Sequence, residues 1–297
     1  MKITRKYITI FITGISIMAC ISTAYAEENY NTEFSFQYYS SDDDSSEIIV
    51  YGVNAEIYFS EVDTTGHPYA EAAFLERIGN VSLLVGKGEV EIGSTVEADG
   101  PIYGAMLTYM KPESPIAVQA IYGKRELEYD FPFDGDEDLD SYGLGLGYFI
   151  SDGALVSIDY RHSETDLDIP IINLHETFEY DDYELGVKYV KEKPGGTAIN
   201  LESGIEISQL DDGTDDKSNT IIEISGDYYV NRMTSIGGGL GINTGDDKDD
   251  EGITWVVNFK SFLNPGFSIN TVFEKFLADN DEGEDEDSLS FVVSARF

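Results

Sequence analysis

The sequence predicts an all-β fold: a transmembrane, antiparallel, up-and-down β-barrel of about 14 strands, with 12 or 16 strands as alternatives. Three observations lead to this prediction. The first residues have the order of a secretory signal, hydrophobic and polar residues alternate along most of the remaining chain, and the connections between alternating segments form two sets of different composition. The chain is therefore expected to consist of a signal peptide, residues 1–26, and a barrel, residues 27–297.

The N-terminal segment combines the three parts of a secretory signal. Basic residues within the first six positions precede a mostly apolar stretch over residues 7–21, and Ala24-Tyr25-Ala26 supplies the small-residue cleavage site. Cys20, the only cysteine, ends a stretch that faintly resembles a lipoprotein cleavage box, which would leave a lipid-anchored N-terminus. The Ala-Tyr-Ala site is the better match, and cleavage there leaves a mature chain without disulfide or thiol chemistry.

The charge balance is strongly acidic, with 57 Asp and Glu against 18 Lys and Arg and a formal net charge of −39. Such a balance argues against nucleic-acid binding, which depends on basic groups that neutralise phosphates. An acidic disordered chain would be poor in aromatic residues, whereas this chain has 20 Tyr and 16 Phe. The acids and the aromatic residues therefore belong to a folded chain with segregated surfaces.

The alternation has a period of two residues, as in a strand with one wet and one dry face. It is clearest over residues 252–262 and over residues 288–297, which end on Phe297. After Ala26 no apolar run has the length that a transmembrane helix needs. A terminal strand of this kind is expected to close the barrel by pairing with the first strand.

Fourteen such segments follow one another along the mature chain. They cover residues 30–40, 47–59, 80–91, 101–111, 115–129, 140–150, 154–166, 177–190, 197–209, 219–230, 234–244, 252–262, 266–278 and 288–297. An even number is expected of a single-chain bacterial barrel with both chain ends on the periplasmic side.

The connections alternate in character. One set is acidic and covers residues 42–44, 97–100, 134–140, 166–176, 211–216, 246–251 and 279–287. The other set is shorter, supplies tight-turn residues and covers residues 111–115, 151–153, 193–196, 231–233 and 264–266. Because the strands run up and down, the two sets lie on opposite rims, and the acidic rim is expected to face outward.

Aromatic residues lie toward the ends of the predicted strands, as in Tyr58-Phe59, Tyr148-Phe149 and Tyr228-Tyr229. Outer-membrane barrels carry aromatic girdles there, although half-buried soluble strands also favour Tyr and Phe. A soluble all-β protein is the alternative fold. The polar face of these strands argues against a soluble protein, because this face needs water inside the fold. The apolar face must then meet lipid rather than a dry core.

The polar face predicts a charged lumen. By alternation its acidic residues are Glu33, Glu56, Asp159, Glu184, Glu202, Glu206, Glu223, Asp227 and Glu274, and its basic residues are Arg161, Lys188, Lys260 and Arg296. Nine acids against four bases make the interior negative, which predicts preference for cations over anions. The opposing interpretation is that these residues pair with one another and plug the barrel, although glycines at alternate positions over residues 143–147 and 237–241 leave room inside.

The segment from Val62 to Arg77 interrupts the strand rhythm. Residues 70–75 favour helix and follow Pro68, so the segment is either a short helical turn tucked under or into the barrel or merely a link between two strands. No long loop that would constrict the lumen stands out, and the sequence assigns no gate.

The same segment resembles a stretch of the putative general bacterial porin family. The matching motif has as its main residues Asp63, Pro68, Glu71, Phe74, Leu75 and Arg77. The signal, the alternation and the terminal Phe297 extend a looser likeness over the chain. The resemblance implies an outer-membrane β-barrel porin for diffusion of small hydrophilic solutes, with this segment at the periplasmic end, and it supplies no solute and no catalytic residue.

Metal binding and catalysis have weak support. Asp134, Asp136, Asp138 and Asp140 offer hard oxygen ligands for a divalent cation such as calcium, but they lack EF-hand spacing and are interpreted as a solvated loop. No other cofactor is predicted. The histidines are scattered and no nucleophile motif surrounds them, so the chain is not expected to be an enzyme.

The favoured function is a passive diffusion channel for small hydrophilic solutes. The alternative is a structural or surface-interaction barrel whose acidic external loops bind divalent cations, lipopolysaccharide or a host ligand. The expected partners are outer-membrane lipid and lipopolysaccharide, the barrel-assembly machinery through the strand that ends in Phe297, and small polar solutes or cations, but no nucleic acid.

Overall fold

The computed structural model describes residues 29–43, 45–93, 96–130, 135–170, 174–193, 196–211, 216–246, 251–278 and 285–297. The expected signal peptide, residues 1–26, lies outside this part of the chain. The elements are β1 (Asn29–Asp42), β2 (Ser46–Asp63), α2 (Ala72–Leu75), β3 (Asn80–Ile92), β4 (Val96–Tyr109), β5 (Ile116–Asp130), β6 (Gly135–Ser151), β7 (Ala154–Ile169), β8 (Leu174–Lys193), β9 (Thr197–Asp211), β10 (Asp216–Asn231), β11 (Thr234–Gly245), β12 (Gly252–Asn264), β13 (Phe267–Ala278) and β14 (Glu286–Arg296).

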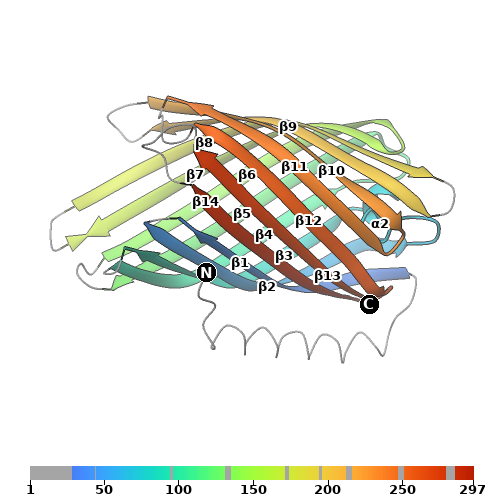
Figure 1. The fold of residues 1–297 in the computed structure, drawn as a ribbon, viewed down its shortest axis with the longest axis horizontal. Coiled ribbons are helices and arrows are strands. Elements are labelled where there is room, and N and C mark those ends of the chain that lie inside the picture. The colour runs from blue at the N-terminus through green and yellow to red at the C-terminus, as the bar shows by residue number, and fades with distance from the viewer. Residues whose placement is uncertain are drawn as a thin grey trace.

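The strands form one closed antiparallel barrel, in which each strand pairs with its sequence neighbours and β14 returns to β1 (Figure 1). At this seam the register places Glu33 opposite Arg296 and Tyr38 opposite Phe291. The predicted fold class and all fourteen predicted segments are confirmed. In the part of the chain that the structure describes, no helix is long and apolar enough to cross a membrane.

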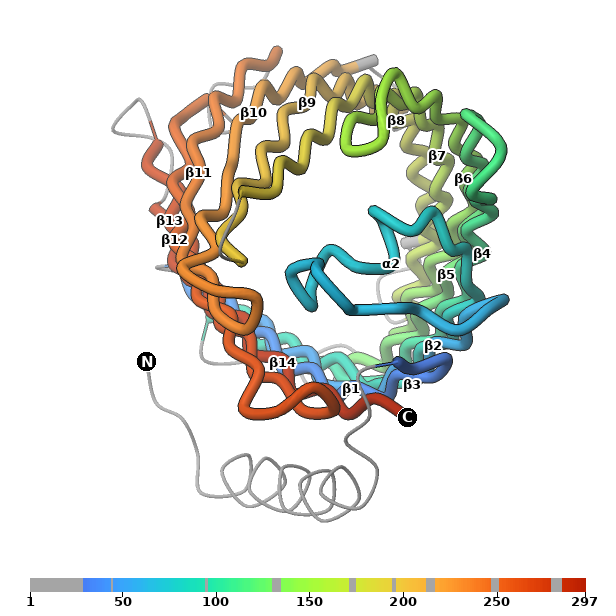
Figure 2. The backbone as a smooth tube through the Cα atoms, turned by 90° about the vertical axis from the view of Figure 1, so that its right-hand side faces the viewer, coloured from blue at the N-terminus to red at the C-terminus, as the bar shows by residue number. Residues whose placement is uncertain are grey.

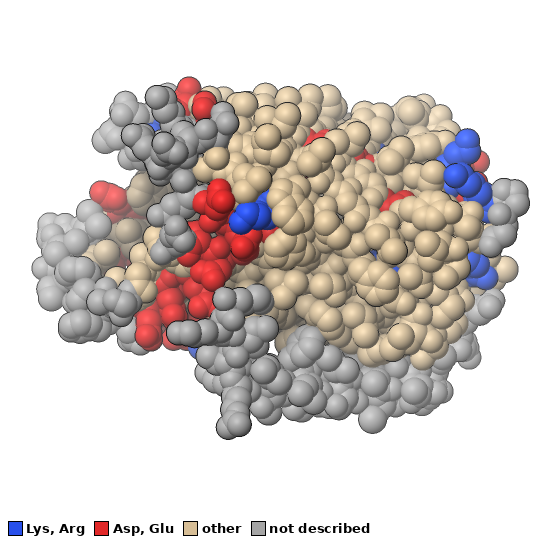
Figure 3. All heavy atoms as spheres, in the orientation of Figure 1, with Lys and Arg blue, Asp and Glu red and all other residues tan. Residues whose placement is uncertain are grey.

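The alternation produces two different faces because successive side chains of a strand point to opposite sides. In β6, Leu144, Leu146 and Ile150 are 67%, 55% and 64% exposed on the outside, whereas a side chain at Gly145 would collide with Asp159 on the inside. Figure 3 shows the outer wall as a broad band of uncharged residues, with acidic side chains gathered at the end opposite α2 and basic side chains at the α2 end.

Several acidic stretches expected as connections are parts of strands. Residues 97–100 belong to β4, residues 135–140 to β6, and the stretch from 166 is divided between β7 and β8. The prediction was wrong here because hydrophobic alternation ends where the lipid belt ends, whereas backbone pairing continues into water. Cross-strand ion pairs accompany these extensions, for example Lys87 with Asp99 at 2.6 Å.

Residues 64–79, which we call the inserted segment, leave the wall after β2 and lie inside the barrel at one end (Figure 2). A small hydrophobic core holds this segment against the wall, consisting of Tyr30, Tyr58, Val62, Ala72 and Ile78. The interpretation of this stretch as a short helical turn tucked into the barrel is therefore confirmed, and its interpretation as a mere link between strands was wrong (Figure 2). The sequence had shown no long loop that constricts the lumen, whereas this segment lies inside it (Figure 2). The helix has only four residues, Ala72–Leu75, within the stretch 70–75 that favours helix, and so short a helix leaves too little periodicity in the sequence to fix its bounds.

Candidate functional site

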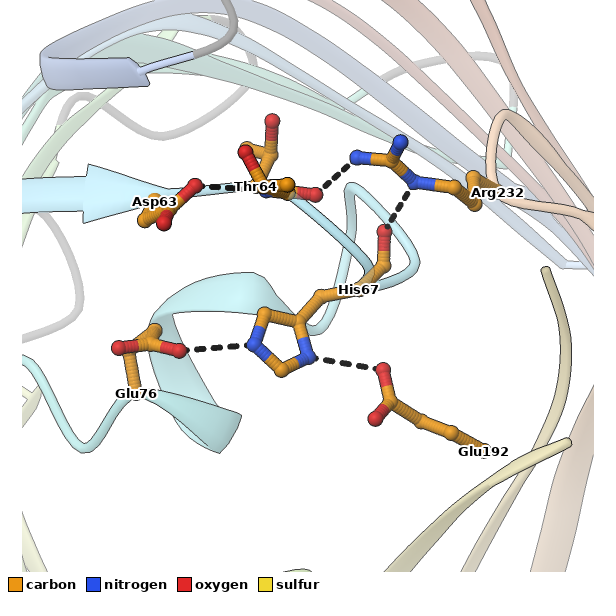
Figure 4. A network of polar contacts seen from close by, with 7 residues as sticks. Asp63, Thr64, His67, Glu76, Glu192 and Arg232 are labelled. Atoms are coloured by element: carbon orange, nitrogen blue, oxygen red, sulfur yellow. Dashed lines mark hydrogen bonds and ion pairs between the residues drawn. The ribbon is translucent and has the colours of Figure 1, made fainter. Parts of the chain in front are cut away.

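The inserted segment is fixed first by Arg232, in the turn between β10 and β11. The Nε atom of Arg232 donates a hydrogen bond to the carbonyl of His67 at 3.0 Å, and its guanidinium also donates to the carbonyl of Thr64 (Figure 4). The backbone N–H of Tyr69 donates to the carbonyl of Arg232 at 2.9 Å. These bonds tie the segment to the far side of the lumen from β2.

A second anchor comes from the barrel seam. Arg296 donates a hydrogen bond from Nη1 to the carbonyl of Tyr69 at 2.8 Å and from Nε to the carboxylate of Glu33 at 2.6 Å. Its guanidinium lies 4.6 Å from the ring centroid of Phe262, which meets the Tyr69 ring edge-on at 5.4 Å. The side chain of Arg296 is only 6% exposed, so its charge depends on Glu33 for compensation.

Glu71 is the central charged residue of the inserted segment, and it is 5% exposed. Its carboxylate accepts a hydrogen bond from the Tyr229 hydroxyl at 2.7 Å and pairs with Lys188 at 3.0 Å. Lys188 also pairs with Glu202 at 2.9 Å. One base therefore joins an acid of the wall to an acid of the segment and compensates part of their combined charge.

Two further motif residues, Phe74 and Arg77, fix the last part of the segment. Phe74 packs against Phe149 with ring centroids 5.4 Å apart, and the guanidinium of Arg77 lies 4.5 Å from the Phe149 centroid. Arg77 also pairs with Asp152 at 3.0 Å and adopts a positive φ of 52°, which lets the chain turn back toward β3. Pro68 is fully buried. The motif is thus a set of contacts that hold one segment across the lumen.

The remaining two motif residues lie at the two ends of this arrangement. The carboxylate of Asp63, the last residue of β2, accepts a hydrogen bond from the backbone N–H of Thr65 at 2.7 Å and so shapes the entry to the segment. Leu75 ends α2 near the turn at Gly153 between β6 and β7.

His67 forms one hydrogen bond to β8 and one within the inserted segment. Its Nδ1 atom lies 2.8 Å from Glu192, and its Nε2 atom lies 2.7 Å from Glu76 (Figure 4). Partial burial alone would lower the pKa of His67, but the hydrogen bonds to Glu192 and Glu76 outweigh it and raise the pKa above its ordinary value. The imidazolium form is therefore the one that holds both carboxylates.

We expect this contact to weaken as the pH rises. Protonated His67 donates to both carboxylates, whereas neutral imidazole has one donor. Because the folded-state pKa is raised, the stabilisation is complete below the unfolded value of about 6.5 and is lost as pH rises through the folded value. Channel recordings at about pH 6 and about pH 9 should show larger or more frequent openings at the higher pH. His67→Gln should abolish the difference, and an unchanged pH response in that variant would contradict the assignment.

Farther from the segment, the lumen wall carries a row of carboxylates. The register places Asp159 opposite Glu184, and Glu184 opposite Glu206, on β7, β8 and β9. The carboxylates of Glu184 and Glu223 both lie beside Gly204, which has no side chain to separate them. None of these four acids forms an ion pair with a basic residue that the structure describes.

One basic residue lies among them. Arg161 pairs with Asp182, its cross-strand neighbour, through Nε at 2.9 Å and Nη2 at 2.8 Å. The Arg161 side chain remains half exposed.

Comparison with protein families decides what this barrel is. Residues 4–297 match the model of the family described as "Putative general bacterial porin". The chain belongs to this family. It is a porin of the bacterial outer membrane, and none of the curated proteins matches its sequence.

Solved structures share the fold of this porin. The crystal structure of the Acinetobacter baumannii outer membrane protein Omp33 matches with a TM-score of 0.54 and 19% identity, covering 91% of this chain and 99% of that one. The beta domain of the Bordetella autotransporter BrkA matches with a TM-score of 0.50 and 10% identity, covering 90% of this chain and 100% of that one. At these identities the likeness concerns the barrel alone.

The structure sorts the thirteen lumen residues predicted for this porin into two levels. Those close to the inserted segment are Glu33, Glu56, Lys188, Glu202, Asp227, Lys260 and Arg296. Those farther along the lumen are Asp159, Arg161, Glu184, Glu206, Glu223 and Glu274. Three of the four basic residues thus lie near the inserted segment, and five acids accompany a single base, Arg161, farther along the lumen.

The described members of the four weak metal candidates form no metal site. Asp134 lies outside the described residues, and Asp136, Asp138 and Asp140 are exposed at alternate positions of β6. In the described part of the chain, no three acids or histidines lie close enough together to hold a metal ion. Asp140 instead accepts a hydrogen bond from the Tyr122 hydroxyl at 3.0 Å.

Residues that the prediction missed include Arg232 and Asp182, and also Tyr58, Phe149 and Tyr229, which had been placed in the aromatic girdle. These three aromatic side chains are 9%, 4% and 3% exposed and face inward. Their neighbours Phe59, Tyr148 and Tyr228 are 53%, 55% and 49% exposed and face outward. Adjacent residues of a strand cannot share a face, so each aromatic pair already contained an inward member.

Proposed function

We propose that this porin is a passive diffusion channel for small hydrophilic solutes, that it prefers cations, and that the inserted segment forms its narrowest passage. The observation that carries the proposal is the row of carboxylates at Asp159, Glu184, Glu206 and Glu223 on the water-facing wall. Their excess over described basic partners attracts cations and repels anions. Near the inserted segment, Lys188 pairs with Glu71 and Glu202 and Arg296 pairs with Glu33, so these three carboxylates contribute less.

A bilayer recording under a KCl gradient tests the selectivity. The wild-type reversal potential should have the sign of a cation-selective pore, and the double variant Glu184→Gln/Glu206→Gln should shift it toward zero. Glu128→Gln is a matched control, because Glu128 is exposed on the outer face of β5. A wild-type anion preference, or an unchanged potential in the double variant, would show that this row does not select the ions.

Glu202→Gln provides a further comparison. Its carboxylate is held by Lys188 at 2.9 Å and by the Asn200 side chain, also at 2.9 Å. Its removal should therefore change the reversal potential less than removal of Glu206, whose carboxylate accepts a hydrogen bond only from Ser208 among the described residues.

The alternative proposal is a surface-interaction barrel whose acidic rim binds lipopolysaccharide or a host ligand through divalent cations. The acidic strand extensions gathered at the end opposite α2 (Figure 3) favour it. Silence of a correctly folded barrel in the bilayer, combined with calcium-dependent binding of lipopolysaccharide, would support this alternative against the channel. We also propose that the assembly machinery recognises β14 and Phe297, as expected of a terminal barrel strand.

A further inference from the structure

Two cavities adjoin each other on the lumen side of β5 to β10. The larger has a volume of about 520 Å³, and its lining includes Ser141, Ser163, Ser208, Tyr180 and Lys217. The smaller has a volume of about 310 Å³, and its lining includes Gln119, Asp159, Glu184 and Glu206. Arg161 and Asp182 line both cavities, so the two spaces meet at this ion pair.

The two cavities differ in the balance of their charged lining residues. The larger one is bordered by two basic residues and one acid, Arg161, Lys217 and Asp182, among neutral hydroxyl groups. The smaller one is bordered by Arg161 and by four carboxylates, those of Asp159, Asp182, Glu184 and Glu206. Asp159 precedes Arg161 by two residues on β7, so their side chains share a face at a spacing of roughly 7 Å. A bound solute therefore meets a cationic region and an anionic region within the length of a small molecule.

Arg161 is prepared to bind a carboxylate. Asp182 occupies its Nε and Nη2 atoms through a single oxygen, Oδ2. A guanidinium has five N–H donors in a fixed plane, so the edge that carries Nη1 keeps donors for a second carboxylate while Asp182 fixes the orientation of the plane. Half of the Arg161 side chain is accessible to solvent.

We propose that these two cavities form one binding site for small zwitterions of the ω-amino acid type, with the carboxylate at Arg161 and the ammonium group at Asp159, Glu184 and Glu206. The proposal rests on the proposed channel function, for which it names a solute class. A simple anion would meet the acidic row without compensation, and a simple cation would leave the guanidinium edge without a ligand. A molecule that carries both charges satisfies both regions.

Equilibrium dialysis of the folded, detergent-solubilised barrel tests the proposal with three matched probes. 5-Aminovalerate has both charges, 5-aminovaleramide lacks the carboxylate, and valerate lacks the ammonium group. We expect saturable binding of 5-aminovalerate and at least about tenfold weaker binding of the two analogues. Equal binding of the three probes, or no binding of any, would overturn the site.

Variants then test the assigned residues. Arg161→Gln and Glu184→Gln should each weaken 5-aminovalerate binding at least about tenfold, and Arg161→Lys should restore part of the loss, because a point charge replaces a fork. Lys275→Gln is the control outside the lumen, since Lys275 pairs with Asp287 beside the acidic rim. Heat modifiability on gels verifies folding of each variant. Binding that is unchanged in a folded Arg161→Gln barrel would refute the assignment.

Bilayer recordings separate this inference from the channel proposal. A barrel that conducts potassium but binds no 5-aminovalerate is a channel without this site. A barrel that is silent but binds 5-aminovalerate in an Arg161-dependent way has the site but not the proposed channel function.

Discussion

Replacing residues 65–77 with a short Gly-Ser linker is expected to raise the single-channel conductance severalfold. The inserted segment crosses the lumen from β2 to Arg232, Lys188 and Asp152, so its removal opens the passage at the end of the barrel where it lies (Figure 2). The wall itself should remain closed, since the strand pairs do not depend on the segment. Planar-bilayer recording of the purified variant measures the effect.

The control replaces residues 111–114, in a turn of the same rim, with the same linker. This turn joins β4 to β5, and among the described residues its hydrogen bond with the inserted segment runs from Nη1 of Arg77 to the backbone carbonyl of Pro112 at 3.5 Å, an acceptor that the linker also offers. Its conductance should equal that of the wild type. If the folded variant without the inserted segment conducts no better than the wild type, the narrowest passage lies elsewhere in the barrel.

An intermediate result is expected when only one anchor is removed. Arg232→Gln loses the donors to the carbonyls of His67 and Thr64 but leaves the Arg296 and Lys188 contacts in place. The segment should then move more within the lumen, and the current should fluctuate between closed and open levels. A steady current at the wild-type level would show that the Arg232 contact does not restrain the segment.

The sequence predicted the barrel because strand alternation is a local property. Each face of a strand meets one solvent, so the apolar residues Leu144 and Leu146 indicate the face that meets lipid, and Gly145 between them lies on the lumen face. This assignment needs no knowledge of the neighbouring strands. The strand count followed, because the turns and acidic stretches separate the segments clearly. The ends of the strands could not be predicted from the sequence, because strand pairing that continues beyond the lipid belt leaves no hydrophobic pattern.

The candidate site was predictable only in part. Alternation places Glu202 and Glu206 on the same face, but it does not reveal that Lys188 pairs with Glu202. The contact of Lys188 with Glu202 depends on the register of β8 against β9. Lys188 also pairs with Glu71, which comes from a segment distant in the sequence. The inward members of the aromatic pairs were the available signal, because Tyr58, Phe149 and Tyr229 had to pack against something inside the barrel.

The stability of the barrel seam should depend strongly on Arg296. Its side chain is 6% exposed and that of its partner Glu33 is 14% exposed, and the register places them directly opposite each other on β14 and β1. Arg296→Met leaves a buried carboxylate without its compensating charge, which should lower the free energy of unfolding by about 3–5 kcal/mol. It also removes the donor to the carbonyl of Tyr69, so the inserted segment should loosen at the same time.

Urea unfolding of barrels refolded into lipid vesicles measures this change, and a double variant tests its cause. Glu33→Met together with Arg296→Met removes both charges and should recover most of the lost stability, because the penalty arises from the unpaired carboxylate rather than from the loss of attraction. Lys275→Met breaks an exposed pair with Asp287 and should cost at most about 1 kcal/mol. If the double variant is as unstable as Arg296→Met alone, packing of the guanidinium between Tyr30 and Phe262 holds the seam, and the ion pair does not.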